Sequence, residues 1–504
     1  MEHLINWHYP MSGLDKMRVL YVSAEVAPFA KVGGLADVAA GLPKAIKELG
    51  HDCRVILPYY QLIADNPRWK TKVIVESFEV NLNPVWTKTA SLRQLDFEGM
   101  TYYFIETDEW FIESKDSGSM YQPGGEVHAF FVAATLKAME MIMWIPDVVH
   151  ANDWHTGFLP VLLKEKMGPI WDKTGSVFSI HNMAYQGEFS IDSLDWLDLS
   201  HDLYNFEQVE AWGQVNFMKA GMSFADVVNT VSPSYAEEIQ TEEYGCGLEG
   251  LNSYLAENDR LFGVLNGLDY DVWNPVTDTR ITANFSPTQL DGKIACRESL
   301  MGQLGFTPIP GAPLVGMISR ISTQKGFDLL VTSAHELFEL PIQMVVQGLG
   351  DPQIIEGLRH LEKTYPNQFK FLNAFDEELA QQIYSGCDAF LMPSAFEPCG
   401  LGQLIAMRYG TLPIVRATGG LKDTVIEGVN GFAFENRSRK EFIDAVSRAH
   451  AAFSTPQWTT MVTNAMTADF GWKASAMKYL ELYEKAIKRR AGQVMIQERP
   501  KHSA

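Results

Sequence analysis

The sequence alternates between short apolar runs and longer amphipathic stretches over most of its length. In its first half the runs are MRVLYVSAE, CRVILPYY, TYYFIET, DVVHAND, SVFSIHN and DVVNTVS. A second set follows, with the runs PLVGMISR, IQMVVQG, FKFLNAF, AFLMPSAF and LPIVRAT. Short apolar strands that alternate with helices are typical of parallel sheets with helices on both faces. The sequence therefore predicts an α/β fold, and its 504 residues are too many for one ordinary core.

The alternation breaks once, in the turn-rich stretch LFGVLNGLDYDVWNP at residues 261–275. This break predicts two doubly wound domains, 17–265 and 266–471, after a short N-terminal extension at 1–16. A last helix is expected at 472–492, followed by a tail at 493–504. Four apolar residues of this helix recur at helical spacing and predict its buried face, namely Ala476, Tyr479, Leu480 and Tyr483.

Charge and cysteine content exclude several classes of function. With 41 basic and 62 acidic residues the formal net charge is -21, which argues against a nucleic-acid or anionic-membrane partner but leaves room for a phosphate ligand. No apolar run approaches the roughly 18 residues of a membrane span, and no signal peptide is evident. Five scattered cysteines without a C-x-x-C pattern indicate a reducing cytoplasm, with neither a disulfide framework nor structural zinc.

Two Gly-Gly-Leu-x-Asp sequences stand at predicted strand-to-helix junctions, in KVGGLADV and in ATGGLKDTV. Glycines let backbone N–H groups approach a bound group closely, and the start of a helix favours negative charge. Ligands of doubly wound sheets bind outside the carboxyl ends of the strands, so the two loops are expected on opposite walls of one cleft. The alternative is that each glycine pair only forms a tight turn. Lys31 inside the first loop favours ligand binding there, and for the second loop both interpretations stay open.

Two further loops follow predicted strands of the second domain. In SRISTQKGFD, Arg320 and Lys325 are five residues apart at the start of a helix and fit a diphosphate, with a surface basic pair as the alternative. In PSAFEPCGLGQ, Glu397 lies between prolines and Gly400 opens the next helix. A carboxylate there can hold sugar or ribose hydroxyls. Cys399 is an alternative nucleophile, although no histidine accompanies it in the sequence.

Two patterns raise the question of a metal. DVVHANDWHTG places His150, Asp153 and His155 after a strand, but the two-residue spacing of the last pair does not match the H-E-x-x-H arrangement. A polar loop that touches a substrate is therefore favoured. NGLDYDVWNP contains a D-x-D at Asp269 and Asp271, where its place in the interdomain turn favours turn capping.

Taken together, the motifs resemble those of bacterial glycogen synthase and plant starch synthase. The resemblance extends from residue 17 to about residue 488 and depends on the order and spacing of many short motifs: KVGGLADV, DVVHANDWHTG, SIHNMAYQG, NFMKAGMSFAD, TVSPSYAEEI, GVLNGLD, SRISTQKG, GLGDP, PSAFEPCGLGQL and RYGTLPIVRATGGLKDTV. It implies the GT-B fold, two Rossmann-like domains that face each other across a cleft, with the C-terminal helix crossing back to the first. It further implies a retaining glucosyltransferase that moves glucose from ADP-glucose to the non-reducing end of an α-1,4-glucan.

The resemblance also assigns residues, and it implies neither a metal nor a cofactor. The expected catalytic residues are His155 in the donor-sugar pocket, Arg320 and Lys325 at the diphosphate and Glu397 beside the donor glucose. The expected substrate-binding residues are Lys31, Gly33, Gly34, Asp37, Asn266, Cys399, Gly400, Leu401, Thr418, Gly419 and Gly420. The location implied is cytoplasmic, or the plastid stroma for a plant protein, although no transit peptide is evident.

The sequence departs from the family pattern at several places. The family commonly has Asp-Asn-x-x-Arg-Phe where residues 122–131 read QPGGEVHAFF, and an arginine that DEWFIESKDSGSMY lacks. Ala395 stands where many members have arginine, and Ile405 where many other retaining GT-B enzymes have glutamate. The first two differences fall where the family binds its acceptor. They leave open a related transferase with another acceptor or donor nucleotide, or a weakly active glucan-binding relative.

Overall fold

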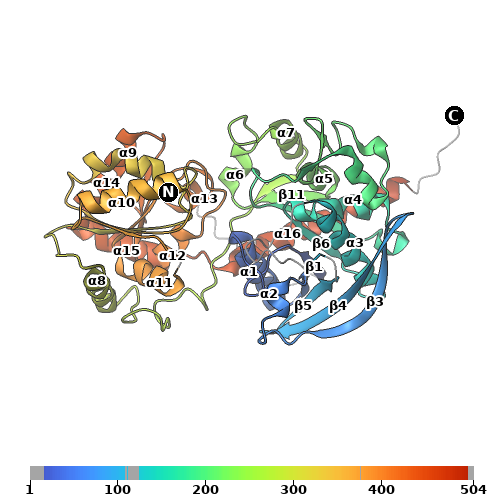
Figure 1. Cartoon of the computed structure of the whole chain (residues 1–504), viewed down its shortest axis with the longest axis horizontal. Coiled ribbons are helices and arrows are strands. Elements are labelled where there is room, and N and C mark those ends of the chain that lie inside the picture. Colours follow the sequence, from blue (N-terminus) through green and yellow to red (C-terminus); the bar gives the residue numbers. More distant parts are fainter. Residues whose placement is uncertain (1–15, 108–109, 112–123, 375, 498–504) are drawn as a thin grey trace. The chain divides into compact units, whose positions relative to one another are not determined.

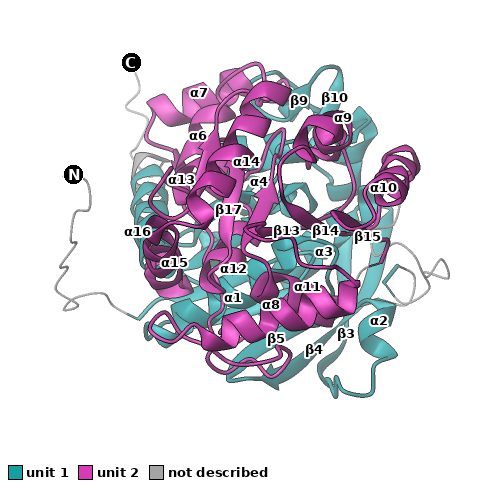
Figure 2. Cartoon of the chain, turned by 90° about the vertical axis from the view of Figure 1, so that its left-hand side faces the viewer, with its two compact units in different colours: residues 1–229, 476–504 teal, residues 230–475 magenta. Residues whose placement is uncertain are grey.

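The computed structural model of the protein describes residues 16–107, 110–111, 124–374 and 376–497 (Figure 1). The chain forms two compact units, residues 1–229 with 476–504 and residues 230–475 (Figure 2). We refer to them as unit 1 and unit 2. All but one residue of the predicted N-terminal extension and residues 498–504 of the predicted tail lie outside the described residues.

Unit 1 contains a mixed sheet whose strands lie in the order β11-β7-β6-β1-β2-β5-β4-β3. The pairs β1–β2, β1–β6, β2–β5 and β6–β7 are parallel. Six of these strands coincide with the six apolar runs of the first half of the sequence and confirm that prediction: β1 (Arg18–Val22), β2 (Asp52–Pro58), β5 (Met100–Glu106), β6 (Val148–Asn152), β7 (Gly175–Ile180) and β11 (Val227–Thr230). Counted in chain order, these six lie in the sequence 3-2-1-4-5-6, the doubly wound order with a switch point between β1 and β6.

A long antiparallel hairpin, β3 (Lys72–Asn83) and β4 (Trp86–Phe97), extends this sheet and was not among the predicted strands. Phe78, Val80 and Leu82 are buried, whereas the residues between them are exposed. A strand with one solvated face has no continuous apolar run, so the apolar runs of the sequence do not predict this hairpin. A smaller antiparallel sheet has the order β8-β10-β9, formed by Glu188–Phe189, Gln214–Asn216 and Glu210–Ala211.

The helices of unit 1 include the final helix of the chain, α16 (Trp472–Gln497), whose residues from Ala476 onward belong to this unit. The four residues predicted for its buried face are at most 5% exposed. The Tyr479 hydroxyl accepts a hydrogen bond from Asn229, and the Tyr483 hydroxyl is bonded to His150, which confirms that the helix packs on the first sheet. The other helices of unit 1 are α1 (Gly34–Glu48), α2 (Gln61–Ala64), α3 (Glu126–Met141), α4 (Phe158–Glu165) and α5 (Phe217–Phe224). Unit 1 also contains the 3-10 turns η1 (Trp154–Thr156), η2 (Pro169–Trp171), η3 (Ile191–Leu197) and η4 (His201–Leu203).

Unit 2 contains a parallel sheet in the order β15-β14-β13-β16-β17-β18. Its strands are β13 (Leu314–Ile318), β14 (Gln343–Gln347), β15 (Phe369–Leu372), β16 (Ala389–Met392), β17 (Leu412–Arg416) and β18 (Phe432–Phe434). The first five coincide with the five apolar runs of the second half of the sequence. This order is again 3-2-1-4-5-6, so the switch point lies between β13 and β16. Both sheets confirm the predicted α/β fold.

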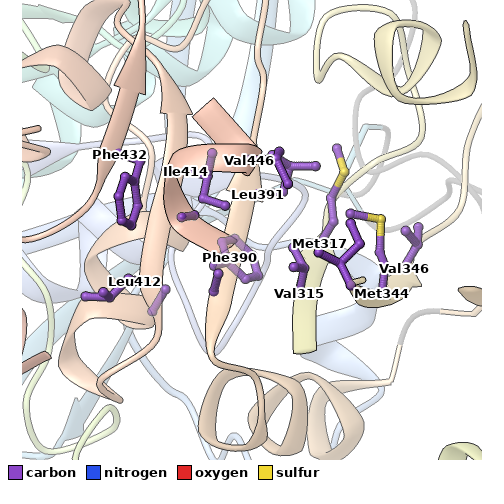
Figure 3. Packing of buried hydrophobic residues seen from close by; sticks show 14 of the residues in the cluster. Val315, Met317, Met344, Val346, Phe390, Leu391, Leu412, Ile414, Phe432 and Val446 are labelled. Atoms are coloured by element: carbon purple, nitrogen blue, oxygen red, sulfur yellow. The ribbon is translucent and has the colours of Figure 1, made fainter. Parts of the chain in front are cut away.

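The core of unit 2 lies where the strands meet the helices that cover them, and Figure 3 shows part of it. The side chains labelled there come from five strands and from α14: Val315, Met317, Met344, Val346, Phe390, Leu391, Leu412, Ile414, Phe432 and Val446. The remaining elements of unit 2 are α6 (Pro233–Glu238), α7 (Glu249–Glu257), β12 (Leu261–Gly263), α8 (Asp291–Leu304), α9 (Phe327–Leu337), α10 (Pro352–Thr364), α11 (Glu377–Gly386), α12 (Gly402–Arg408), α13 (Gly419–Thr424), α14 (Arg439–Phe453) and α15 (Pro456–Thr467). In the described part of the chain, no helix has both the length and the apolar character needed to cross a bilayer.

Candidate active site

The loops that follow β13 and β16 meet at the switch point of unit 2. Lys325 lies in the loop after β13 and Glu397 in the loop after β16. The Lys325 Nζ donates to Glu397 Oε2 at 2.6 Å, although the two residues are 72 positions apart. Ser394 Oγ donates to the same carboxylate oxygen at 3.1 Å. Because the two side chains are only 20% and 8% exposed, they form an ion pair largely shielded from water.

Arg320 lies in the same loop as Lys325 and is exposed. Its Nη2 donates to the Gln324 side chain at 3.0 Å, and the Gln324 carbonyl accepts the N–H of Ala395 at 2.7 Å. Gly326 allows the two loops to touch, because it has a φ of +79° and a Cβ there would lie 2.2 Å from the Pro393 carbonyl oxygen. The arrangement joins both loops and leaves the Arg320 guanidinium accessible.

Gly419 and Gly420 serve close packing within unit 2. A Cβ on Gly419, which has a φ of +46°, would lie 2.0 Å from the carbonyl oxygen of Glu397. A Cβ on Gly420 would lie 2.2 Å from the carbonyl oxygen of Cys399. The preceding residue, Thr418, is buried. The structure therefore gives this glycine pair a packing role, whatever else the turn binds.

Cys399, Gly400, Leu401 and Asn266 complete this part of unit 2. Burial raises the pKa of the Cys399 thiol to about 12, although a backbone hydrogen bond from Asn266 lowers it. A thiol that stays protonated is a poor nucleophile, which argues against the alternative role of this cysteine. Gly400 has a φ of +75° and Leu401 precedes α12. Asn266 is 7% exposed, and its Oδ1 has no hydrogen-bond partner within the described residues.

In unit 1 the corresponding switch point lies beside the loop after β1. Lys31 Nζ and Asp37 Oδ1 form an exposed ion pair at 2.8 Å. The N–H of Gly33 and the N–H before it both donate to one carboxylate oxygen of the buried Glu25, at 2.8 and 2.7 Å. A Cβ on Gly33 or Gly34 would meet no atom within 4 Å. The Glu25 carboxylate therefore holds this loop in place, and the backbone of Gly33 and Gly34 is open on the side to which a Cβ would point.

His155 and Asp153 follow β6 on the other side of that switch point. The His155 ring lies against Trp154 and His128, with ring centroids 4.1 and 4.8 Å away. Burial, and secondarily His128, holds the pKa of His155 well below its usual range, so the imidazole is neutral. Asp153 has a φ of +55° and accepts the N–H of His181 at 2.7 Å. Burial raises the pKa of Asp153 to about 7 against the effect of that hydrogen bond.

The geometry bears on both patterns that raised the question of a metal. Each ring nitrogen of the buried His150 is already hydrogen-bonded, one to Tyr483 at 2.8 Å and the other to Ser179 at 2.6 Å. Asp269 Oδ1 accepts the N–H of Asp271 at 2.8 Å, which confirms turn capping at the D-x-D. Across the ranges that the structure describes, no three His, Cys, Asp or Glu side chains are grouped so as to hold a metal ion.

Three buried or half-buried side chains at these loops were not singled out from the sequence. Glu25 stands three residues after the end of β1, so its place at the carboxyl end of a strand was a usable signal. Gln324 and Glu238 carried none, because their roles depend on loops distant in sequence. Of the stretch that departs from the family pattern, residues 122–123 lie outside the described residues. Phe130 and Phe131, in α3, are fully buried and belong to the core.

Comparisons with known proteins agree with this architecture. The family described as "Starch synthase catalytic domain" matches residues 18–253, and the family "Glycosyl transferases group 1" matches residues 306–451. The glycogen synthase of Syntrophotalea carbinolica is 39% identical over 94% of this chain and 99% of its own length. The glycogen synthases of Lactococcus lactis and Thermotoga maritima are each 41% identical, over 93% and 94% of this chain and 100% and 99% of their own lengths.

Among solved structures, the catalytic domain of starch synthase IV from Arabidopsis thaliana, bound to ADP and acarbose, is similar over 94% of this chain and 100% of that one, with a TM-score of 0.86 and 33% identity. Sucrose-phosphate synthase from Thermosynechococcus elongatus has a TM-score of 0.58 at 18% identity, over 93% of this chain and 99% of that one, and shares the fold. Near-complete coverage at about 40% identity leaves no ambiguity about the family. The chain is a GT-B glucosyltransferase and belongs to the glycogen synthase and starch synthase family.

Proposed function

We propose that the protein transfers glucose from ADP-glucose to the non-reducing end of an α-1,4-glucan, with retention of configuration. The observation that carries the proposal is the Lys325–Glu397 pair at the switch point of unit 2, beside the accessible Arg320. Cations at this edge of a doubly wound sheet suit a nucleoside diphosphate. The relatives named glycogen synthase, and a similar starch synthase structure bound to ADP and acarbose, support this donor and acceptor.

The leaving group defines the roles of the two cations. When the bond between glucose C1 and the phosphate oxygen breaks, negative charge develops on the departing ADP. Arg320 and Lys325 would stabilise that charge, and such preorganised contacts contribute strongly to catalysis. Glu397 holds Lys325 in place through the 2.6 Å contact and offers its carboxylate to the sugar hydroxyls.

Other residues in the two units are proposed to bind the substrates. Asn266 Oδ1, a buried acceptor with no partner within the described residues, suits a donor hydroxyl. The neutral His155 would hydrogen-bond the sugar without adding charge. In the first glycine loop, Lys31 is a further cation for phosphate, and the open backbone of Gly33 and Gly34 admits a ligand. Asp37 would hold Lys31 in position through their ion pair.

A front-face substitution accounts for retention with these groups. The C1–O bond to ADP breaks while a bond from C1 to the acceptor 4-oxygen forms on the same face. The acceptor hydroxyl proton passes to a phosphate oxygen of the leaving ADP. Cys399, with its protonated thiol, is no nucleophile for a double displacement. Trapping a glucosyl adduct on any side chain would refute this step.

The test measures nucleoside-diphosphate release from the purified protein. ADP-glucose and UDP-glucose are each supplied with glycogen, with maltose and without an acceptor. We expect fast ADP release only with glycogen, together with entry of labelled glucose into the polymer. Release with maltose alone, and no label in polymer, would favour the second candidate, a related transferase with another acceptor. The departure from the family pattern at residues 122–131 is the observation that keeps this candidate in view.

A further inference from the structure

Helix α6 and the serine before it are hydrogen-bonded to two of the loops to which we assign donor binding. All of these contacts lie within unit 2. Ser232 Oγ donates to the Pro398 carbonyl at 2.6 Å. The N–H and the hydroxyl of Ser234 donate to the two carboxylate oxygens of Asp423, in α13, at 2.9 and 2.7 Å. The N-terminal end of α6, from Ser232 to Ser234, therefore contacts both the Glu397 loop and α13.

The last residue of α6, Glu238, contacts the Thr418–Gly419 turn through its carboxylate. Oε1 of Glu238 accepts both the Thr418 hydroxyl, at 3.0 Å, and the Gly419 N–H, at 2.8 Å. Its other oxygen, Oε2, is buried and has no hydrogen-bond partner in the part of the chain that the structure describes. No ion pair of Glu238 is present among the described side chains. Burial raises the pKa of Glu238, whereas the two hydrogen bonds from the turn and the charges of Arg416 and Lys422 lower it, so the contact with the turn stabilises the charged form of this half-buried carboxylate.

The turn that Glu238 contacts is also joined directly to the Glu397 loop, because the Gly420 N–H donates to the carbonyls of Glu397 and Pro398, each at 3.2 Å. Gly419 has a φ of +46° and packs within 2.0 Å, measured from an added Cβ, of the Glu397 carbonyl. A glycine in this conformation loses much freedom on folding and gains freedom readily when a contact is lost. The charged acceptor therefore restrains a turn whose small displacement would also move Glu397.

We propose that Glu238 is a positioning residue for donor binding: it fixes the Thr418–Gly419 turn against the Glu397 loop, and through it the groups that meet the donor. This inference depends on the proposed function, in which that turn and Glu397 contact the nucleotide sugar. It does not assign Glu238 any contact with the substrate.

The test compares Glu238→Ala and Glu238→Gln with a matched control, Glu237→Ala. Glu237 is the neighbouring residue on the same helix, is exposed and carries the same charge. Three readouts are measured for each purified full-length variant: amide hydrogen exchange of peptides covering residues 417–424, the dissociation constant of ADP by calorimetry, and kcat and KM for ADP-glucose.

We expect faster exchange at residues 417–424 in Glu238→Ala, weaker ADP binding, and a value of kcat/KM for ADP-glucose lower by roughly tenfold or more, as for loss of a hydrogen-bonded charged acceptor. Glu238→Gln keeps an oxygen acceptor and should recover most of this loss. Glu237→Ala should behave like the unaltered protein.

Two results would overturn the inference. One is unchanged exchange and kcat/KM in Glu238→Ala. The other is an equal loss of protection throughout unit 2 with no recovery in Glu238→Gln, which would make Glu238 a general fold contact. If Glu238→Ala does not fold, Glu238→Met, which keeps the length of the side chain but removes the acceptor, replaces it in all three readouts. If the unaltered protein releases no ADP from ADP-glucose, the proposed function fails, and the exchange data still judge the restraint of the turn.

Discussion

Lys325 and Glu397 neutralise each other's charge at a largely buried position, and either charge without its partner would destabilise the fold. Removing one partner of a buried pair leaves an uncompensated charge, which costs more than the pair itself contributes. The two side chains meet because β13 and β16 are adjacent and parallel, so that their carboxyl ends share one edge of the sheet. Chemistry and local stability are therefore coupled at these residues.

Lys325→Ala should reduce turnover, by roughly 2–4 kcal/mol of transition-state stabilisation or about 30- to 900-fold, because a preorganised cation at the leaving group is lost. The measurement is kcat for ADP release with glycogen. Lys363→Ala, at an exposed position of α10, is the control and should have no effect. The double variant Lys325→Ala/Glu397→Gln removes the stranded charge. If it regains full activity, Lys325 does not act on the leaving group.

Asp153 should make the stability of unit 1 depend on pH in an unusual direction. Its pKa is raised from 3.8 to about 7 by burial, so ionisation of this carboxyl opposes folding. Its contribution therefore becomes unfavourable as pH rises from about 3.8 to about 7. Asp153→Asn should gain stability relative to the unaltered protein across this window, as measured by denaturant unfolding at several pH values. Asp202→Asn, at an exposed site, is the control and should show no such trend. If the difference in stability between Asp153→Asn and the unaltered protein does not change with pH, the raised pKa of Asp153 is contradicted.

At the scale of secondary-structure elements, the two glycine turns show how one motif serves two purposes. Both precede a helix and share the letters Gly-Gly-Leu-x-Asp, and the sequence predicted both as candidate ligand loops. The second pair is packed against the backbone of the Glu397 loop, whereas the first has open space around it. Nothing in the motif itself separates the two cases, because the close packing of the second pair comes from a loop of unit 2 that lies about 20 residues before it in sequence.

Gly419→Ala and Gly33→Ala should therefore differ sharply. The first forces a Cβ to within 2.0 Å of a carbonyl oxygen at a positive φ and should lower the melting temperature through a loss of roughly 1–3 kcal/mol. The second, at an extended φ of -140°, should change stability by no more than about 0.5 kcal/mol. If substrate approaches the first loop, Gly33→Ala should still raise KM. Calorimetry and kinetics on both variants check these expectations, and equal melting temperatures would contradict them.

Helix α16 is anchored by polar as well as apolar contacts. Tyr483→Phe removes the hydroxyl bonded to the buried His150 and should cost about 1–3 kcal/mol, because a ring nitrogen is then left without its partner. ADP affinity should stay unchanged, since both residues lie in the interior of unit 1. Tyr254→Phe, at an exposed position of α7, is the control for denaturant unfolding. A similar small effect in both variants would show that the hydrogen bond contributes little.

At the scale of the whole molecule, the alternation of apolar runs predicted eleven of the twelve strands that lie in the doubly wound order, and β18 was the exception. It missed β3 and β4, whose half-solvated strands lack such runs. At the site, strand ends indicated Arg320, Lys325 and Glu397, but not that Lys325 and Glu397 would touch, because that depends on strand order. The role of Glu238 could not be predicted from the sequence, since a single acidic residue in a helix belongs to no recognisable pattern. The domain limits at 265/266 and 471/472, and the roles of the site residues, stay predictions.

The two units differ in how the chain supplies them. Unit 2 is one continuous stretch, whereas unit 1 is completed only by residues from Ala476 onward, which return to bury Tyr479 and Tyr483. A chain that emerges from the ribosome in order can finish unit 2 before unit 1, because domains fold as their residues become available. The hydrogen bonds that Asn229 and His150 make to α16 must wait for the end of translation. A product that stops short of this helix is thus left with an open core in the half that was made first, where quality-control proteases would recognise it.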